Sequence, residues 1–125
     1  MANAFRFRPQ HRLLLTAEYT GIFGQRRVLR GSLLDLHYGS APNTKSTARL
    51  GVRLGIVVPK RNAALSVTRN YCKRVAREIF RHRRAELPAL DLILRLAKPT
   101  KTMSRESLGS LLRDDFDKLL ARLPK

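Results

Sequence analysis

The chain has 125 residues and a formal net charge of +17, with 26 Lys and Arg against nine Asp and Glu. A hydrophobic content of 43% supports one folded domain over residues 1–125 and excludes a disordered basic tail. No apolar run approaches the roughly 20 residues that span a bilayer, residues 1–12 lack the apolar core of a signal peptide, and a single cysteine excludes an internal disulfide. We therefore expect a cytoplasmic nucleic-acid-binding protein without a membrane partner.

The N-terminal part of the chain predicts an irregular arm followed by a short helix. Residues 1–12 mix arginine with phenylalanine and show no period, which is typical of an arm that a partner orders. Thr16 can cap a helix over residues 17–23, on which Tyr19 and Phe23 share one face. These two rings suit a hydrophobic core and the stacking of unpaired bases about equally well, so the residues alone leave both interpretations open.

Three segments have the patterns of β-strands. Residues 31–38 alternate between apolar and polar side chains, and residues 39–48 are rich in Gly, Ser, Pro, Asn and Thr, which indicates a flexible loop. Residues 49–58 place aliphatic side chains on one face and arginine with glycine on the other, Arg53 among them. Glycine in a strand often marks a close approach of another chain, so this face is a candidate binding surface. Residues 91–97 predict a largely buried strand.

Residues 67–84 contain neither Gly nor Pro and have the period of an amphipathic helix, with Asn62 or Ser66 as its N-cap. Its apolar stripe has members at steps of three and four: Val67, Tyr71, Cys72, Val75, Ile79 and Phe80. Its polar stripe follows the same steps on the opposite side: Asn70, Lys73, Arg74, Arg77, Arg81 and Arg84. We expect the cysteine to be a small buried hydrophobe.

Positive charge is concentrated in and just before this helix. From Lys60 to Arg84 there are nine Lys and Arg and one acid, Glu78, a local balance of +8. Solvated helix faces ordinarily mix both signs, and like charges three or four residues apart repel each other. A one-signed face is therefore better explained by a polyanionic partner than by solubility.

The rest of the chain predicts support for the fold and no catalytic site. Ser104 can cap a last helix with an apolar face, on which Asp114, Asp115 and Asp117 are expected to look outward. Neighbouring carboxylates on a helix diverge and therefore form a poor metal site. The three histidines have no ligand spacing with one another or with the cysteine, and there is no Gly-rich phosphate loop. We predict no catalytic residue and no metal ligand in the protein itself.

The segment from Arg69 to Arg81 has the sequence RNYCKRVAREIFR. It resembles the signature R-N-x-x-K-R-x-x-R-E-x-F-R of the bacterial ribonuclease P protein subunit, with every fixed position kept. The resemblance extends over nearly the whole chain. Arg12-Leu13 with Tyr19 and Phe23 is similar to the family's first helix, residues 53–61 to the strand before the signature, and residues 87–91 to the entry of the last strand.

This resemblance implies an α+β fold, a two-layer sandwich of a small mixed sheet and three main helices, as in the ribosomal protein S5 domain 2-like fold. It implies a left-handed β-α-β crossover, an exception to the usual right-handed rule. It also implies a division of labour: a catalytic RNA with Mg²⁺ removes the 5′ leader from precursor tRNA. The protein would bind that RNA and hold the single-stranded leader in a cleft between the first helix and the sheet.

The resemblance also implies binding roles for particular residues. Those expected to contact the catalytic RNA lie in the signature: Arg69, Asn70, Lys73, Arg74, Arg77 and Arg81. Those expected to line the leader cleft come from the first helix, the sheet and their flanks: Arg12, Tyr19, Phe23, Arg53 and Lys60. On this interpretation the protein needs no cofactor and no protein partner, and Mg²⁺ goes with the RNA. Two positions depart from the family: Tyr19 stands where Phe is frequent, and Arg95 interrupts the apolar last strand.

Two other classes of function compete with an RNA-binding subunit of a ribonucleoprotein endonuclease. Composition alone also fits a structural ribosomal or general RNA-binding protein, from which only the signature and the paired aromatics distinguish this chain. A nuclease that acts without RNA would need a constellation of carboxylates or histidines, and the sequence offers none.

Overall fold

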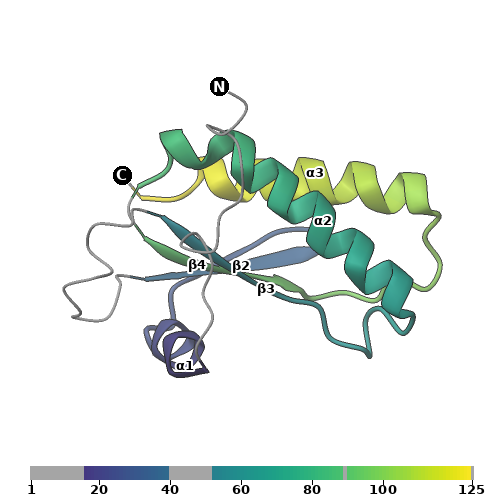
Figure 1. The fold of residues 1–125 in the computed structure, drawn as a ribbon, viewed down its shortest axis with the longest axis horizontal. Coiled ribbons are helices and arrows are strands. Elements are labelled where there is room, and N and C mark those ends of the chain that lie inside the picture. Colours follow the sequence, from purple (N-terminus) through teal and green to yellow (C-terminus); the bar gives the residue numbers. More distant parts are fainter. Residues whose placement is uncertain (1–15, 40–51, 89, 125) are drawn as a thin grey trace.

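Two long helices cover one face of a four-stranded sheet, and a short helix lies against the other face (Figure 1). The computed structural model describes residues 16–39, 52–88 and 90–124. The helices are α1 (Thr16–Gly24), α2 (Ser66–Arg83), the 3₁₀ helix η4 (Arg84–Glu86) and α3 (Arg105–Ala121). The strands are β1 (Val28–Arg30), β2 (Leu34–Gly39), β3 (Arg53–Val57) and β4 (Asp91–Leu96).

The sheet has the strand order β1-β2-β4-β3. β2 pairs antiparallel with both β1 and β4, whereas β3 and β4 are parallel. Parallel neighbours cannot be joined by a tight turn, and α2 makes the required crossover between them. The mixed sheet with three helices confirms the α+β fold class that was expected.

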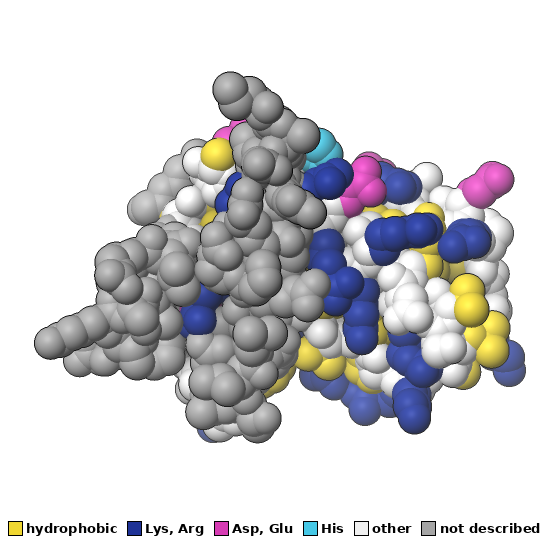
Figure 2. Space-filling view, viewed as in Figure 1, with side chains coloured by type: hydrophobic (Ala, Val, Ile, Leu, Met, Phe, Trp, Pro, Cys, Tyr) yellow, Lys and Arg dark blue, Asp and Glu magenta, His cyan; other side chains and the backbone are white. Residues whose placement is uncertain are grey.

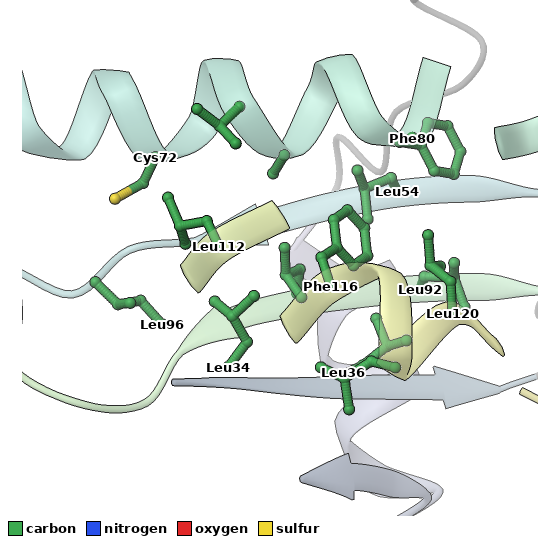
Figure 3. Close-up of a cluster of buried hydrophobic side chains, with 14 of the residues drawn as sticks. Leu34, Leu36, Leu54, Cys72, Phe80, Leu92, Leu96, Leu112, Phe116 and Leu120 are labelled. Atoms are coloured by element: carbon green, nitrogen blue, oxygen red, sulfur yellow. The ribbon is translucent and has the colours of Figure 1, made fainter. Parts of the chain in front are cut away.

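The main core lies between the sheet and the layer formed by α2 and α3. Alternate strand residues point into it, among them Leu36 of β2, Leu54 of β3 and Leu92 of β4 (Figure 3). Phe80 of α2 and Phe116 of α3 are fully buried against them. Full burial of a large apolar side chain contributes roughly 1.5–3 kcal/mol, so these contacts fix both helices on the sheet.

The buried stripe of α2 begins later along the helix than the sequence predicts. Cys72, Val75, Ala76 and Phe80 are buried, which confirms the expected burial of the cysteine. Val67, in contrast, was expected in the apolar stripe but is 66% exposed. Its prediction is wrong because the core contacts of α2 begin one turn later in the helix.

The start of α2 also differs from the prediction. Leu65 is the N-cap residue and makes no side-chain capping bond, so neither Asn62 nor Ser66 caps the helix. Asn62 is buried instead, and its Nδ2 donates to the Leu96 carbonyl at 2.8 Å. The Asn62 carbonyl accepts from the backbone N–H and the hydroxyl of Thr100. Asn62 therefore joins the turn before α2 to the chain that follows β4.

The predicted strands are found with shifted ends. β2 begins at Leu34 rather than at residue 31, and the three-residue strand β1 was not predicted. β3 covers only part of the predicted strand 49–58, of which residues 49–51 lie outside the described residues. The helix predicted at 17–23 and the strand predicted at 91–97 are confirmed to within one residue at each end. The arm 1–12 and residues 40–48 of the predicted loop 39–48 also lie outside the described residues.

Asp115 anchors the turn between β1 and β2, and the expectation that it looks outward is wrong. Its carboxylate accepts hydrogen bonds of 2.8–2.9 Å from the backbone N–H groups of Ser32, Leu33 and Leu34. Gly31 lies so close to this carboxylate that a Cβ there would collide with it. The turn thus satisfies its backbone donors with a buried side chain from α3.

Candidate RNA interface

One side of α2 carries four cations and an asparagine, and we call this surface the cationic face. It consists of Asn70, Lys73, Arg74, Arg77 and Arg81. Asn70 and Arg74 are exposed and the other three are half-buried. Figure 2 shows Lys and Arg side chains gathered over the part of the molecule that α2 occupies.

Three of these arginines meet at one place on the cationic face. Arg74, Arg77 and Arg81, with Glu78, line a shallow hollow of about 330 Å³. The Nε atom of Arg81 is buried and has no acceptor among the described residues. An unsatisfied buried donor of this kind costs roughly 1–3 kcal/mol.

Arg69 does not belong to this surface, although the signature includes it. Its guanidinium turns back and donates to the carbonyls of Ala63 and Ala64 at 3.0 and 2.8 Å. Arg69 therefore holds the turn that leads into α2. Arg83, at the other end of the helix, is likewise engaged within the protein, by Glu86 and Asp117.

The second candidate surface lies on the opposite side of the sheet, where α1 packs. Ile22 of α1 is fully buried against Ile93 of β4, with Val57 of β3 beside them. The neighbouring ring of Phe23 is 36% exposed and stands edge-on to His37 of β2, with 4.7 Å between the ring centroids. We call the surface formed by Phe23, His37 and their neighbours on this side of the sheet the α1 face.

The expected leader-cleft residues meet only in part. Phe23 is on the α1 face, whereas the side chain of Tyr19 and the whole of Arg12 lie outside the described residues. Lys60 is exposed in the turn after β3. Arg53 is the first residue of β3, whereas Lys60 follows the strand's last residue, Val57, by three residues. Lys60 and Arg53 therefore lie toward opposite ends of β3.

Arg53, which the resemblance places in the leader cleft, is engaged within the fold. It is 5% exposed and forms a bidentate ion pair with Asp91, at 2.9 Å from Nε and 2.7 Å from Nη2. Asp91 is itself 1% exposed. Because a buried guanidinium without its counter-charge is costly, this pair stays closed and serves the fold.

Arg95 and His37 are residues of the α1 face that sequence reasoning did not assign to a site. Arg95 is half-buried on β4, directly beside Asp35 of β2 and Val57 of β3 in the sheet register. The signal for Arg95 was visible, since a cation in an otherwise apolar strand needs an environment other than the core. β4 remains a regular strand through it because Arg95 points away from the core side.

His37 is held neutral by its surroundings. Burial lowers its pKa from the ordinary value, an effect that the Asp35 carboxylate opposes and that Arg95 and Arg30 reinforce. Its Nε2 atom is buried without a hydrogen-bond partner in the described structure. The α1 face thus combines an aromatic ring, a neutral imidazole and a cation, a set that suits unpaired nucleotides.

The described ranges contain no group of three or more His, Cys, Asp or Glu side chains placed to hold a metal ion. They also contain no helix long and apolar enough to cross a bilayer. They present two surfaces suited to binding RNA, one cationic and one aromatic, on opposite sides of the sheet.

Comparison with known proteins supports one family. The family model for ribonuclease P matches residues 7–123. A ribonuclease P protein component from an Azoarcus species is 46% identical over 120 residues, covering 96% of this chain and 92% of that protein. The corresponding protein from Bordetella avium is 40% identical over 114 residues, covering 91% and 92%.

Solved structures share the fold. The RNase P protein from Thermotoga maritima, in complex with 1-(4-fluorophenyl)-2-thiourea, superposes with a TM-score of 0.74 at 24% identity, covering 90% of this chain and 99% of that one. The RNase P protein from Staphylococcus aureus gives a TM-score of 0.73 at 22% identity, covering 89% and 93%. At these identities the likeness establishes the fold alone.

Proposed function

This chain belongs to the ribonuclease P protein family, and we propose from that premise how its surface is divided between two RNA ligands. The chain is the protein subunit of a ribonucleoprotein endoribonuclease that processes the 5′ leader of precursor tRNA. In our proposal the cationic face of α2 binds the catalytic RNA and the α1 face binds the leader. The protein contributes binding and no catalytic residue.

The observation that carries this proposal is the one-signed cationic face. Lys73, Arg74, Arg77 and Arg81 project from one side of a single helix, and Glu78 is the only acid among them. Cations fixed along a rigid helix match a phosphate backbone and release its counterions. Binding through such a face weakens steeply with salt, and each bound phosphate adds about one unit to the slope of log affinity against log salt concentration.

The α1 face is proposed for the leader because it offers stacking with little net charge. The exposed Phe23 ring provides the stacking surface, worth about 1–3 kcal/mol per base. Arg95 replaces Arg53 as the cation expected beside this ring, and Lys60 remains a candidate at the end of β3. None of these contacts reads base identity closely, which suits a subunit that must accept many precursors.

The chemistry is proposed to reside in the catalytic RNA with its Mg²⁺ ions. Buried or paired carboxylates of the protein are already engaged in protein contacts: Asp91 with Arg53, Asp115 with backbone amides and Asp117 with Arg83. On this proposal the protein acts in the cytoplasm with its RNA and without a further protein partner.

Cleavage of precursor tRNA at low Mg²⁺ tests the proposal. The reaction is run with protein alone, with catalytic RNA alone and with both. We expect cleavage only in the mixture, since the protein replaces part of the counter-charge that Mg²⁺ otherwise supplies. Cleavage by protein alone would contradict an RNA-based active site, and a mixture no better than RNA alone would leave only general RNA binding.

A further inference from the structure

A cavity of about 620 Å³ opens at the N-terminal end of α2, between α2 and α3. It is enclosed by the turn at residues 61–65, the first half of α2 and the loop at residues 99–105. This volume is within the roughly 300–1,000 Å³ typical of ligand pockets. None of the binding roles described above uses it.

One wall of the cavity is held rigidly by α3. The ring of Tyr71 lies 4.6 Å from the guanidinium carbon of Arg105 and 5.7 Å from that of Arg74. The Tyr71 hydroxyl packs on Gly109, where a Cβ would collide with it. Tyr71 thereby fixes the Arg105 guanidinium at the cavity wall, with Leu108 beside it.

The mouth of the cavity exposes apolar side chains. Leu65 and Val67 are 69% and 66% exposed, and both line the cavity. Single exposed hydrophobic residues are ordinary on a protein surface, but these two flank the same opening. Hydrophobic atoms lie among Lys and Arg at the end of the molecule where α2 begins (Figure 2).

The charged residues that line the cavity are all positive. Arg61, Lys101 and Arg105 line the cavity, and none of its lining residues is acidic. The first turn of α2 contains no acid either. An apolar wall with a cationic rim is complementary to a flat, weakly polar body that carries a negative charge, which is the chemistry of a nucleotide.

We propose that this cavity receives one unpaired nucleotide of the catalytic RNA. Its base lies against Leu65, Val67 and the Arg105 guanidinium, and its phosphate lies at Arg61 and Lys101. The inference rests on the proposed function, because it requires the catalytic RNA to bind along α2.

The position of the cavity in the fold favours the catalytic RNA over the leader as the source of this nucleotide. Arg74 belongs to the cationic face and also contacts the Tyr71 ring, so RNA bound along α2 passes the mouth of the cavity. The α1 face is on the opposite side of the sheet (Figure 1).

The test fills the cavity without changing the charge. Ala64 is exposed and lines the cavity, so Ala64→Phe occupies it. Ala85→Phe makes the same change at an exposed position in η4, beyond the other end of α2. For the unmodified protein and both variants, one measures the Kd for the catalytic RNA against salt, and the dimethyl sulfate reactivity of its unpaired bases, with and without precursor tRNA.

We expect Ala64→Phe to weaken binding by about 5- to 100-fold, the range for removal of one stacked base, with an unchanged salt slope. One or a few unpaired bases of the catalytic RNA should lose their protein-dependent protection, whereas Ala85→Phe should match the unmodified protein. Circular dichroism verifies folding. If Ala64→Phe does not fold, Val67→Ser at a 66% exposed position carries the same expectation.

The inference would be overturned if Ala64→Phe bound the catalytic RNA with the same Kd as the unmodified protein and protected the same bases. It would also be overturned if only the protection of leader bases changed. Failure of the proposed function is distinguishable, because in that case the unmodified protein would itself fail to bind the catalytic RNA or to promote cleavage.

Discussion

The cationic face and the α1 face use the same residue type in opposite ways. On α2, Arg74 is exposed and no carboxylate of the described residues pairs with it. On the other side of the sheet, Arg53 is buried in a bidentate pair with Asp91. The comparison teaches that an arginine in a basic RNA-binding protein is assigned to RNA or to the fold by its burial, and not by its place in a signature.

The physical reason for the difference is desolvation. A guanidinium that gives up its water must be stabilised by a fixed counter-charge, and Asp91 on the adjacent strand provides it. An exposed guanidinium keeps its water until a phosphate replaces it, at little cost to the free protein. Arg53 is therefore built into the fold, while Arg74 is ready for a ligand.

Arg53→Ala should give the largest effect and should act on stability. Removal of one partner leaves Asp91 as an unpaired buried charge, so we expect a loss of about 3–5 kcal/mol in the free energy of unfolding. Urea unfolding measures it. The matched control is Arg30→Ala, which breaks the exposed Arg30–Asp35 pair and should cost at most about 1 kcal/mol.

A stably folded Arg53→Ala protein that had lost only its preference for leader-bearing substrates would contradict this assignment. The arginine would then belong to the leader site, as the sequence suggested.

Asp115→Ala comes next. The substitution removes the acceptor for three backbone N–H groups of the β1–β2 turn, which we expect to cost about 3 kcal/mol. Asp114→Ala, at the exposed neighbouring position, should change the free energy of unfolding by about 0.5 kcal/mol or less. Equal thermal stability of the two variants would refute the anchoring role.

Phe23→Ala separates a binding ring from a core residue. We expect it to weaken binding of leader-bearing precursor by about 1–3 kcal/mol relative to a leaderless substrate, with little loss of stability. Ile22→Ala should do the reverse and destabilise the fold by about 2–5 kcal/mol, since Ile22 is fully buried. If Phe23→Ala unfolded the protein instead, the ring would be part of the core.

Arg74→Ala and Arg69→Ala sharpen the comparison within a single helix. We expect Arg74→Ala to reduce the salt slope of catalytic-RNA binding by about one, because one cation no longer binds a phosphate. Arg69→Ala should leave the slope unchanged and lower stability by about 1–2 kcal/mol, because it releases the carbonyls of Ala63 and Ala64. If both variants reduced the salt slope of catalytic-RNA binding equally, the signature, and not burial, would decide which arginine binds RNA.

The smallest expected effect concerns His37 and pH. Because burial lowers its pKa, the unfolded chain binds more protons than the folded one as the pH falls through the ordinary value of 6.5. The contribution of neutral His37 is present above that value and is lost below it. We expect the unmodified protein to lose more stability than His37→Gln between about pH 7.5 and about pH 5.5. Parallel curves in urea unfolding would show that His37 is not desolvated.

Features set by local periodicity were predictable from the sequence. α2 was located to within one residue because 18 residues repeat an apolar stripe without Gly or Pro. Ser104 caps α3 as expected, with its hydroxyl accepting from the Ser107 N–H at 3.1 Å. The cationic face followed from the same period, which separates residues that point inward from those that point outward.

Features that depend on partners distant in sequence were not predictable. Asp115 was expected in solvent, but its partners lie 81 to 83 residues earlier in the chain. Arg53 finds Asp91 across 38 residues and only because β3 and β4 are parallel. β1 has three residues, too few to show any alternation. In each case the residue type is visible in the sequence, and the tertiary contact decides its role.

Site-specific crosslinking tests most directly whether the two faces bind two different RNAs. A photoreactive group is attached to a new cysteine in Phe23→Cys and in Arg74→Cys. The native Cys72 does not compete, because it is buried and burial raises the pKa of its thiol. In the assembled holoenzyme with precursor tRNA, we expect position 23 to crosslink to the leader and position 74 to the catalytic RNA. Crosslinks from both positions to the same RNA would contradict the division of the surface.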